Sequence, residues 1–170
     1  MAPVAPRHFL RDDDLTPAEQ RQVLELALAF RDDRTFRQPL RGPQGVAVLF
    51  DKPTLRTQLS FATGIAELGG FPVVVDGRLA QIGVRESVED TTRVLERQVS
   101  AVVWRTYGQD RLEAMAAISR VPVVNAVAPD AIRLAPPLVL TPDQARDVVA
   151  FFAGLRLPDD APTPTTETRD

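Results

Sequence analysis

Four short apolar runs alternate with longer segments of helical periodicity, and this alternation restricts the possible folds more than any other feature of the sequence. The runs cover residues 45–50, 71–75, 101–105 and 122–125, and valine is common in them. Uninterrupted apolar runs of this length predict strands that are buried on both faces, as parallel strands are. The predicted fold class is therefore α/β, a single domain whose four-stranded parallel sheet carries helices on both faces.

The segments between these runs carry the signals of helices. Thr16, Pro17 and Glu19 have the spacing of an N-cap, a first helical residue and a capping-box acid, which predicts a helix that runs to about Arg31. Further helices are predicted at about 56–68, 87–97 and 109–119. Strands separated by helices place the carboxyl ends of the strands at one edge of the sheet, where ligands bind in such folds.

Composition limits the class of protein. The chain has 170 residues, a net charge of −3, no cysteine and one histidine, His8, which we expect to be structural. It has no apolar run of about 18 residues, and the first eleven residues lack the apolar core of a signal peptide, so we expect a cytoplasmic protein that does not enter a membrane. Without a basic stripe, nucleic acid is not an expected partner. Neither a metal site nor a cofactor is expected.

The turn after the first predicted strand has the composition of an anion site. Lys52, Thr54, Arg56 and Thr57 stand where the chain passes from strand to helix. A helix start exposes N–H groups and the positive end of the helix dipole, and hydroxyl and guanidinium groups placed there suit a phosphate. Arg105 ends another strand and is expected to reach the same edge of the sheet.

The residues of this turn resemble a family motif. Residues 50–62, FDKPTLRTQLSFA, are similar to Phe-x-Lys-x-Ser-Thr-Arg-Thr-Arg-x-Ser-Phe-Glu, the carbamoyl-phosphate loop of the aspartate and ornithine carbamoyltransferases. Leu55 departs from the motif, because the family's threonine offers a hydroxyl there and leucine offers only its backbone N–H.

Other segments favour the ornithine enzymes. Residues 101–109, AVVWRTYGQ, resemble their Val-Trp-Arg-Thr-Phe-Gly-Gln, which implies that Arg105 reaches carbamoyl phosphate. Residues 81–95 resemble the loop and helix that offer a glutamine, here Gln81, to a neighbouring subunit of a homotrimer. The resemblance covers about 7–126. It implies catalytic roles for Arg56 and Arg105, and a carbamoyl-phosphate site made of Lys52, Thr54, Leu55, Arg56, Thr57, Arg105 and Gln81.

Each of these residues also has a structural interpretation. Lys52 is the only lysine, which a coding bias explains without any function. Thr57 is a possible helix cap, Arg105 a possible salt-bridge partner at a strand end, and Gln81 a possible solvated loop residue.

The family pattern stops near Asn125. The sequence has neither the family's His-Pro-Cys-Gln motif, which polarises the carbamoyl carbonyl, nor its ornithine-binding domain. Residues 125–155 instead resemble the carboxyl-terminal end of acetylornithine-type aminotransferases, where the counterpart of Arg133 grips the substrate carboxylate. No lysine follows Lys52, so the Schiff base of a pyridoxal-phosphate enzyme cannot form there. The chain is predicted to be a chimera: a carbamoyl-phosphate domain at 1–126, an aminotransferase-like segment with one helix at 127–157, and a disordered tail at 158–170.

Three functions are compatible with these features. The first is carbamoyl transfer from carbamoyl phosphate to ornithine, the ornithine carbamoyltransferase step of arginine biosynthesis, in a truncated or chimeric chain that is expected to lack full activity. The second is a non-catalytic module that binds phosphate or carbamoyl phosphate. The third is an inactive fragment. A turnover assay separates the first from the others, and melting with and without phosphate separates the second from the third.

Overall fold

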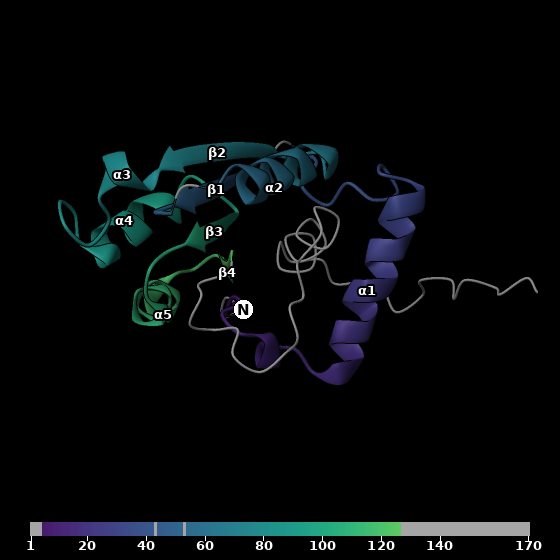
Figure 1. The fold of residues 1–170 in the computed structure, drawn as a ribbon, viewed down its shortest axis with the longest axis horizontal. Helices are drawn as coiled ribbons and strands as arrows, with labels where there is room; N and C mark the ends of the chain where they lie inside the picture. Colours follow the sequence, from purple (N-terminus) through teal and green to yellow (C-terminus); the bar gives the residue numbers. More distant parts are fainter. Residues whose placement is uncertain (1–4, 43, 53, 127–170) are drawn as a thin grey trace, which may run out of the picture.

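The computed structural model describes residues 5–42, 44–52 and 54–126. Within these ranges the elements follow one another as η1, α1, β1, α2, β2, α3, α4, β3, α5 and β4. The predicted helix in 127–157, the tail at 158–170 and the aminotransferase-like resemblance lie outside the described residues and stay predictions. Figure 1 shows the sheet and its helices on one side of the molecule and α1 standing apart from them.

All four strands of the sheet are parallel, as predicted. They are β1 (Gly45–Phe50), β2 (Phe71–Asp76), β3 (Ala101–Arg105) and β4 (Val123–Asn125), in the order β2-β1-β3-β4. Every residue of the inner strand β1 is buried, whereas the edge strand β2 exposes Phe71 and Val74. The predicted strand limits are correct within one residue, because the apolar runs coincide with the buried stretches.

The helices confirm the sequence signals. They are α1 (Pro17–Asp32), α2 (Leu55–Glu67), α3 (Gly77–Ala80), α4 (Val88–Leu95) and α5 (Gln109–Ile118), with the 3₁₀ helix η1 at Asp12–Asp14. Thr16 caps α1 and forms the predicted capping box with Glu19. Hydrogen bonds from the Arg7 side chain and then from Thr16 lower the pKa of Glu19 to about 2. The short helices η1 and α3 were not predicted, because one turn has too few residues to show periodicity.

Two apolar clusters cover the two faces of the sheet. On one face α2 contributes Phe61 and Ile65, which lie in one cluster with Val46, Val48 and Val103 of the sheet. The same cluster includes Phe30 of α1. On the other face the side chains of α5 pack with the alternate residues of the strands; this cluster includes Ala47, Leu49, Val102, Trp104, Leu112 and Met115. The predicted arrangement, a parallel sheet with helices on both faces, is confirmed.

The amino-terminal segment lies along β4 like a short additional strand. The Phe9 N–H donates to the Val123 carbonyl at 2.9 Å, and the Asn125 N–H donates to the Phe9 carbonyl at 2.8 Å. Next to this pairing, the Val123 N–H also donates to Nδ1 of His8 at 3.1 Å. His8 therefore has a structural role here, as expected, because its ring nitrogen satisfies a backbone donor at the sheet edge.

This contact predicts a pH-dependent stability. Burial lowers the pKa of His8 below its ordinary value of 6.5, and the nearby Asp14 carboxylate only partly offsets this. Because the unfolded chain then binds a proton more readily than the folded chain, the free energy of unfolding should fall as the pH falls below about 6.5. Urea denaturation at several pH values between about 5 and 7 measures this slope. His8→Asn, whose amide oxygen can accept the same N–H, should flatten the slope, and an unchanged slope would contradict the assignment to His8.

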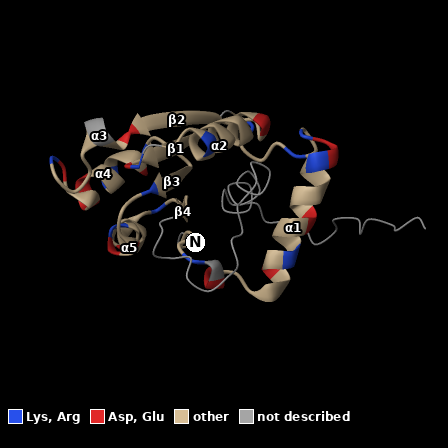
Figure 2. Cartoon of the chain, viewed as in Figure 1, with Lys and Arg blue, Asp and Glu red and all other residues tan. Residues whose placement is uncertain are grey.

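Charge is mixed over the described residues. Figure 2 shows acidic and basic residues interspersed along α1. Within the described ranges no helix has both the length and the apolar character needed to cross a membrane, and no three His, Asp or Glu side chains are grouped so that they would hold a metal ion.

Candidate functional site

The candidate site lies where the strand order reverses. The chain leaves β1 for α2 on one face of the sheet and leaves β3 for α5 on the other, while β1 and β3 are direct neighbours. Phe50 and Arg105 are paired at the carboxyl ends of these strands, and the Asp51 N–H donates to the Arg105 carbonyl at 2.9 Å. Open α/β sheets bind ligands in the crevice at this point, so the fold brings together the two segments that the sequence singled out.

The start of α2 has backbone donors that the side chain of its N-cap residue does not cap. Thr54 is the N-cap residue, yet its side chain makes no capping hydrogen bond. Its hydroxyl instead donates to Oγ1 of Thr57 at 3.2 Å. Thr57 is the third residue of the helix, so its alternative interpretation as the helix cap is wrong. The first N–H groups of the helix thus retain their capacity for an anion.

Arg105 faces this helix start. Its Nη1 donates to Oγ1 of Thr57 at 3.3 Å. Its Nε is buried and has no hydrogen-bond partner among the described residues. A partly buried guanidinium with an unsatisfied donor, beside an uncapped helix start, is a site that gains stability when it binds an anion.

The other predicted residues of the loop differ in exposure. Arg56 lies in the first turn of α2 and is exposed, and the side chain of Leu55 is 72% exposed. Lys52 is partly buried, and its Nζ lies 4.6 Å from the centroid of the Tyr107 ring. This cation–π contact joins the loop after β1 to the loop after β3.

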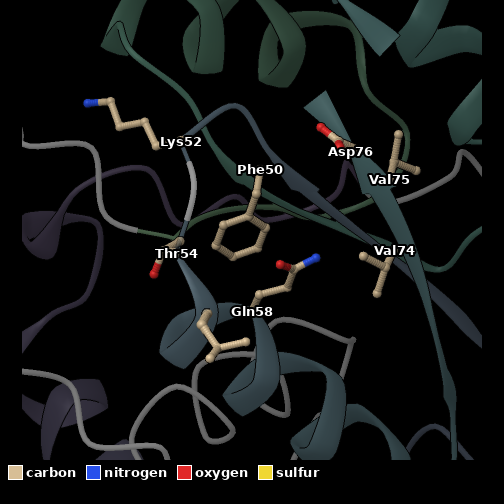
Figure 3. A pocket seen from close by; sticks show the side chains of 8 residues that line it. Phe50, Lys52, Thr54, Gln58, Val74, Val75 and Asp76 are labelled. Atoms are coloured by element: carbon tan, nitrogen blue, oxygen red, sulfur yellow. The ribbon is translucent and has the colours of Figure 1, made fainter. Parts of the chain in front are cut away.

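A cleft of about 390 Å³ adjoins the loop on the side of β2. Figure 3 shows Phe50 near its centre, with Gln58 and Val74 close by and the Lys52 ammonium group pointing away from the Phe50 ring. The cleft is lined by Phe50, Lys52, Thr54, Leu55, Gln58, Val74, Val75 and Asp76. Lys52, Thr54 and Leu55 therefore belong to the loop and also line a cleft that has room for a small polar molecule.

Gln81 lies apart from these groups, in the loop that follows α3. Its side chain is exposed, its φ is +45°, and its N–H donates to the Gly77 carbonyl at 2.8 Å. Within this single chain, direct hydrogen bonds bring Thr54, Thr57 and Arg105 together. The cation–π contact with Tyr107 places Lys52 against the loop that follows Arg105.

Two charged residues near the site were not predicted. Nη1 of Arg111, in α5, lies 2.9 Å from Oδ2 of Asp51. Asp51 occupies a variable position of the motif, and Arg111 follows the Arg105 segment on a helix. Sequence spacing does not pair two residues that are 60 positions apart, so only the fold identifies this contact.

Comparisons with known proteins identify the family of this domain. The family model for the carbamoyl-P binding domain of aspartate/ornithine carbamoyltransferases matches residues 7–131. The ornithine carbamoyltransferase of Bifidobacterium longum subsp. infantis is 60% identical over 124 residues, which cover 73% of this chain and 39% of that protein. The enzyme of the same name from Clavibacter michiganensis is 59% identical, with 73% and 40% covered.

Solved structures show the same relationship. The ornithine carbamoyltransferase of Burkholderia thailandensis has a TM-score of 0.65 and 37% identity, and the match covers 72% of this chain and 43% of that one. The enzyme of Pyrococcus furiosus has a TM-score of 0.68 and 31% identity, with 75% and 42% covered. The chain thus spans about two fifths of the length of the curated relatives it matches. It belongs to the aspartate/ornithine carbamoyltransferase family, whose carbamoyl-P binding domain it contains.

Proposed function

We propose that this chain binds carbamoyl phosphate at the start of α2, as the carbamoyl-phosphate half of an ornithine carbamoyltransferase. The observation that carries the proposal is the placement of Arg105, whose Nη1 bonds Thr57 and whose buried Nε has no partner among the described residues. The phosphate would accept from the first N–H groups of α2, from the hydroxyls of Thr54 and Thr57, and from Arg56 and Arg105. Lys52 would add positive charge as a point charge.

In the transfer reaction, the neutral ornithine δ-amine attacks the carbamoyl carbon, the bond from that carbon to the phosphate oxygen breaks, and the attacking nitrogen loses a proton to the leaving phosphate, which gives citrulline and phosphate. Charge then builds up on the leaving phosphate, and Arg56 and Arg105 would stabilise it. Ornithine, rather than aspartate, is proposed as the acceptor in the full family reaction because the relatives described above are ornithine carbamoyltransferases. Gln81 is proposed to serve a neighbouring subunit of a homotrimer, for which its exposed loop is suited. Sedimentation would test that assembly, and a monomer at high concentration would contradict it.

A non-catalytic binding module is the second candidate. It is favoured by the single histidine of the sequence, since His8 accepts a hydrogen bond from Val123 and is not the histidine of the carbonyl-polarising motif. Binding and turnover therefore have to be measured separately.

Titration of the 170-residue chain with phosphate and with carbamoyl phosphate, followed by NMR of labelled protein, tests the binding proposal. We expect saturable shifts of the amide signals of residues 54–58 and 105–106. For carbamoyl phosphate the dissociation constant should be on the order of millimolar, because the sequence has no His-Pro-Cys-Gln motif to contact the carbamoyl end. If these signals do not respond to either ligand, the chain does not bind at this loop.

Leu55→Thr should tighten phosphate binding about fivefold, which corresponds to one net hydrogen bond of about 1 kcal/mol. The substitution restores the hydroxyl of the family motif, and the exposed leucine side chain has little packing to lose. Leu59→Thr is the matched control, because this leucine lies one turn further along α2 and is also exposed. Equal affinities for Leu55→Thr and the parent chain would show that position 55 does not contact the phosphate.

A further inference from the structure

We propose that Arg111 is a positioning residue that holds three loops in their relative positions, two of which carry the proposed phosphate site. This inference rests on the proposed function for its role, although the contacts themselves do not depend on any ligand. Arg111 lies in α5, and none of the sequence motifs includes it.

The guanidinium of Arg111 reaches a different loop with each of its contacts. Nη1 donates to Oδ2 of Asp51, which follows β1, and to Oγ1 of Thr106, which follows β3, at 2.9 Å each. Nη2 donates to the carbonyl oxygen of Ile82, in the loop that follows α3. The planar group also lies over the Trp104 ring, with Cζ 5.0 Å from the ring centroid. Because guanidinium donors have a fixed geometry, these contacts together fix the relative positions of the three loops.

Two of the loops that Arg111 joins carry the proposed phosphate contacts, and the third carries Gln81, which is proposed to serve a neighbouring subunit. Asp51 precedes Lys52 and the start of α2, Thr106 follows Arg105, and Ile82 follows Gln81. Figure 1 shows α3, α4 and the tips of β1 and β2 gathered at the same end of the molecule. A small displacement of the loop after β1 or of the loop after β3 would change the distance between the Thr54/Thr57 hydroxyl pair and Arg105, to which binding of a phosphate is sensitive.

Arg111 also neutralises a charge that would oppose the ligand. The Asp51 side chain is only 8% exposed, and that of Arg111 is 27% exposed. The other Asp51 oxygen, Oδ1, is buried and has no hydrogen-bond partner among the described residues. A Cβ at Gly77 would lie 2.7 Å from the Phe50 carbonyl oxygen and would also collide with Oδ1, so the chain after β2 closes over this carboxylate. Without Arg111, a buried negative charge would remain beside the proposed phosphate loop.

An ordinary buried ion pair would affect stability alone, whereas a positioning residue affects the ligand site in protein that is still folded. The experiment uses the 170-residue chain with four variants: Arg111→Met, Arg111→Lys, the double variant Arg111→Met/Asp51→Asn, and the control Arg93→Met. Arg93 forms an exposed pair with Asp90 on α4, at 3.8 Å. For each variant, phosphate affinity is measured by titration, and the amide signals of Asp51, Ile82 and Thr106 are recorded without ligand.

Arg111→Met should weaken phosphate binding about tenfold or more, since it both releases the loops and leaves Asp51 unpaired. The double variant should recover part of the lost phosphate affinity, because the Asp51 charge is removed while the loops still lack the contacts of Arg111. Lysine at position 111 should give an intermediate affinity, because it keeps the ion pair but cannot make all three contacts. Without ligand, the amide signals of the three loops should shift together in Arg111→Met and should stay in place in Arg93→Met.

The proposal is overturned if folded Arg111→Met binds phosphate within about twofold of the parent chain, or if only signals of α5 shift. If Arg111→Met does not fold, the same two criteria are applied to the double variant, which contains no unpaired carboxylate. If the double variant does not fold either, they are applied to Arg111→Lys. If the parent chain itself does not bind phosphate, the proposed function fails, and the ligand-free signals alone decide whether Arg111 fastens the loops.

Discussion

Arg105→Met is expected to weaken phosphate binding by about 10- to 100-fold, the loss that corresponds to a charge-assisted hydrogen bond of about 1.5–3 kcal/mol. The partly buried guanidinium of Arg105 contacts Thr57 and retains an unsatisfied Nε, so its charge is less screened than that of a surface arginine. Arg56→Met should also weaken binding, but by less, because Arg56 is exposed and water screens its charge. Titration with inorganic phosphate at constant ionic strength measures both effects.

Arg120→Met is the matched control for these two substitutions. Arg120 precedes β4, so it lies at the opposite edge of the sheet from the carboxyl ends of the strands, and its side chain is 87% exposed. Its loss removes one positive charge from the chain without touching the site. A decrease in affinity equal to that of Arg105→Met would show that phosphate responds to net charge alone and would refute a specific role for Arg105.

Much of the fold could be predicted because its signals are local. The apolar runs of β1 and β3 are buried on both faces, so their limits in the sequence are their limits in the structure. Thr16 and Glu19 mark the start of α1 for a similar reason, since a capping box involves residues only three positions apart. The pairing of Phe9 with β4 could not be predicted, because it joins segments more than a hundred residues apart and depends on which strand forms the sheet edge.

The candidate site likewise contains contacts that the sequence predicts and contacts that only the fold identifies. Thr57 and Arg105 could be predicted as neighbours, because parallel strands bring their carboxyl ends to one edge. The direction of the Lys52 side chain toward Tyr107, and the contacts of Arg111 with Asp51 and Ile82, depend on tertiary packing, which motif spacing does not encode. Residues that hold a site in place are harder to find from sequence than residues that form it, since their partners lie on other elements.

The 170-residue chain is expected to produce no measurable citrulline from carbamoyl phosphate and ornithine, even where it binds phosphate. Loss of a preorganised donor that stabilises developing charge lowers the rate by about a hundredfold to a thousandfold. The sequence has no histidine beyond His8, so the histidine that polarises the carbamoyl carbonyl in the family has no counterpart here. The 170 residues also span only about two fifths of the length of the ornithine carbamoyltransferases that they match, and a reaction whose amine is not oriented loses a further contribution that can reach several kcal/mol.

A citrulline assay with purified chain measures this, with the Bifidobacterium longum relative as the positive control. Arg105→Met provides the internal control, because a trace of activity that survives this substitution comes from a contaminating enzyme. Ornithine-dependent turnover that disappears in Arg105→Met would contradict the prediction and would mean that the residues after β4 supply the missing groups. If turnover is absent while phosphate binding persists, phosphate recognition resides in the strand ends and the start of α2, and carbamoyl transfer requires groups that this chain does not contain.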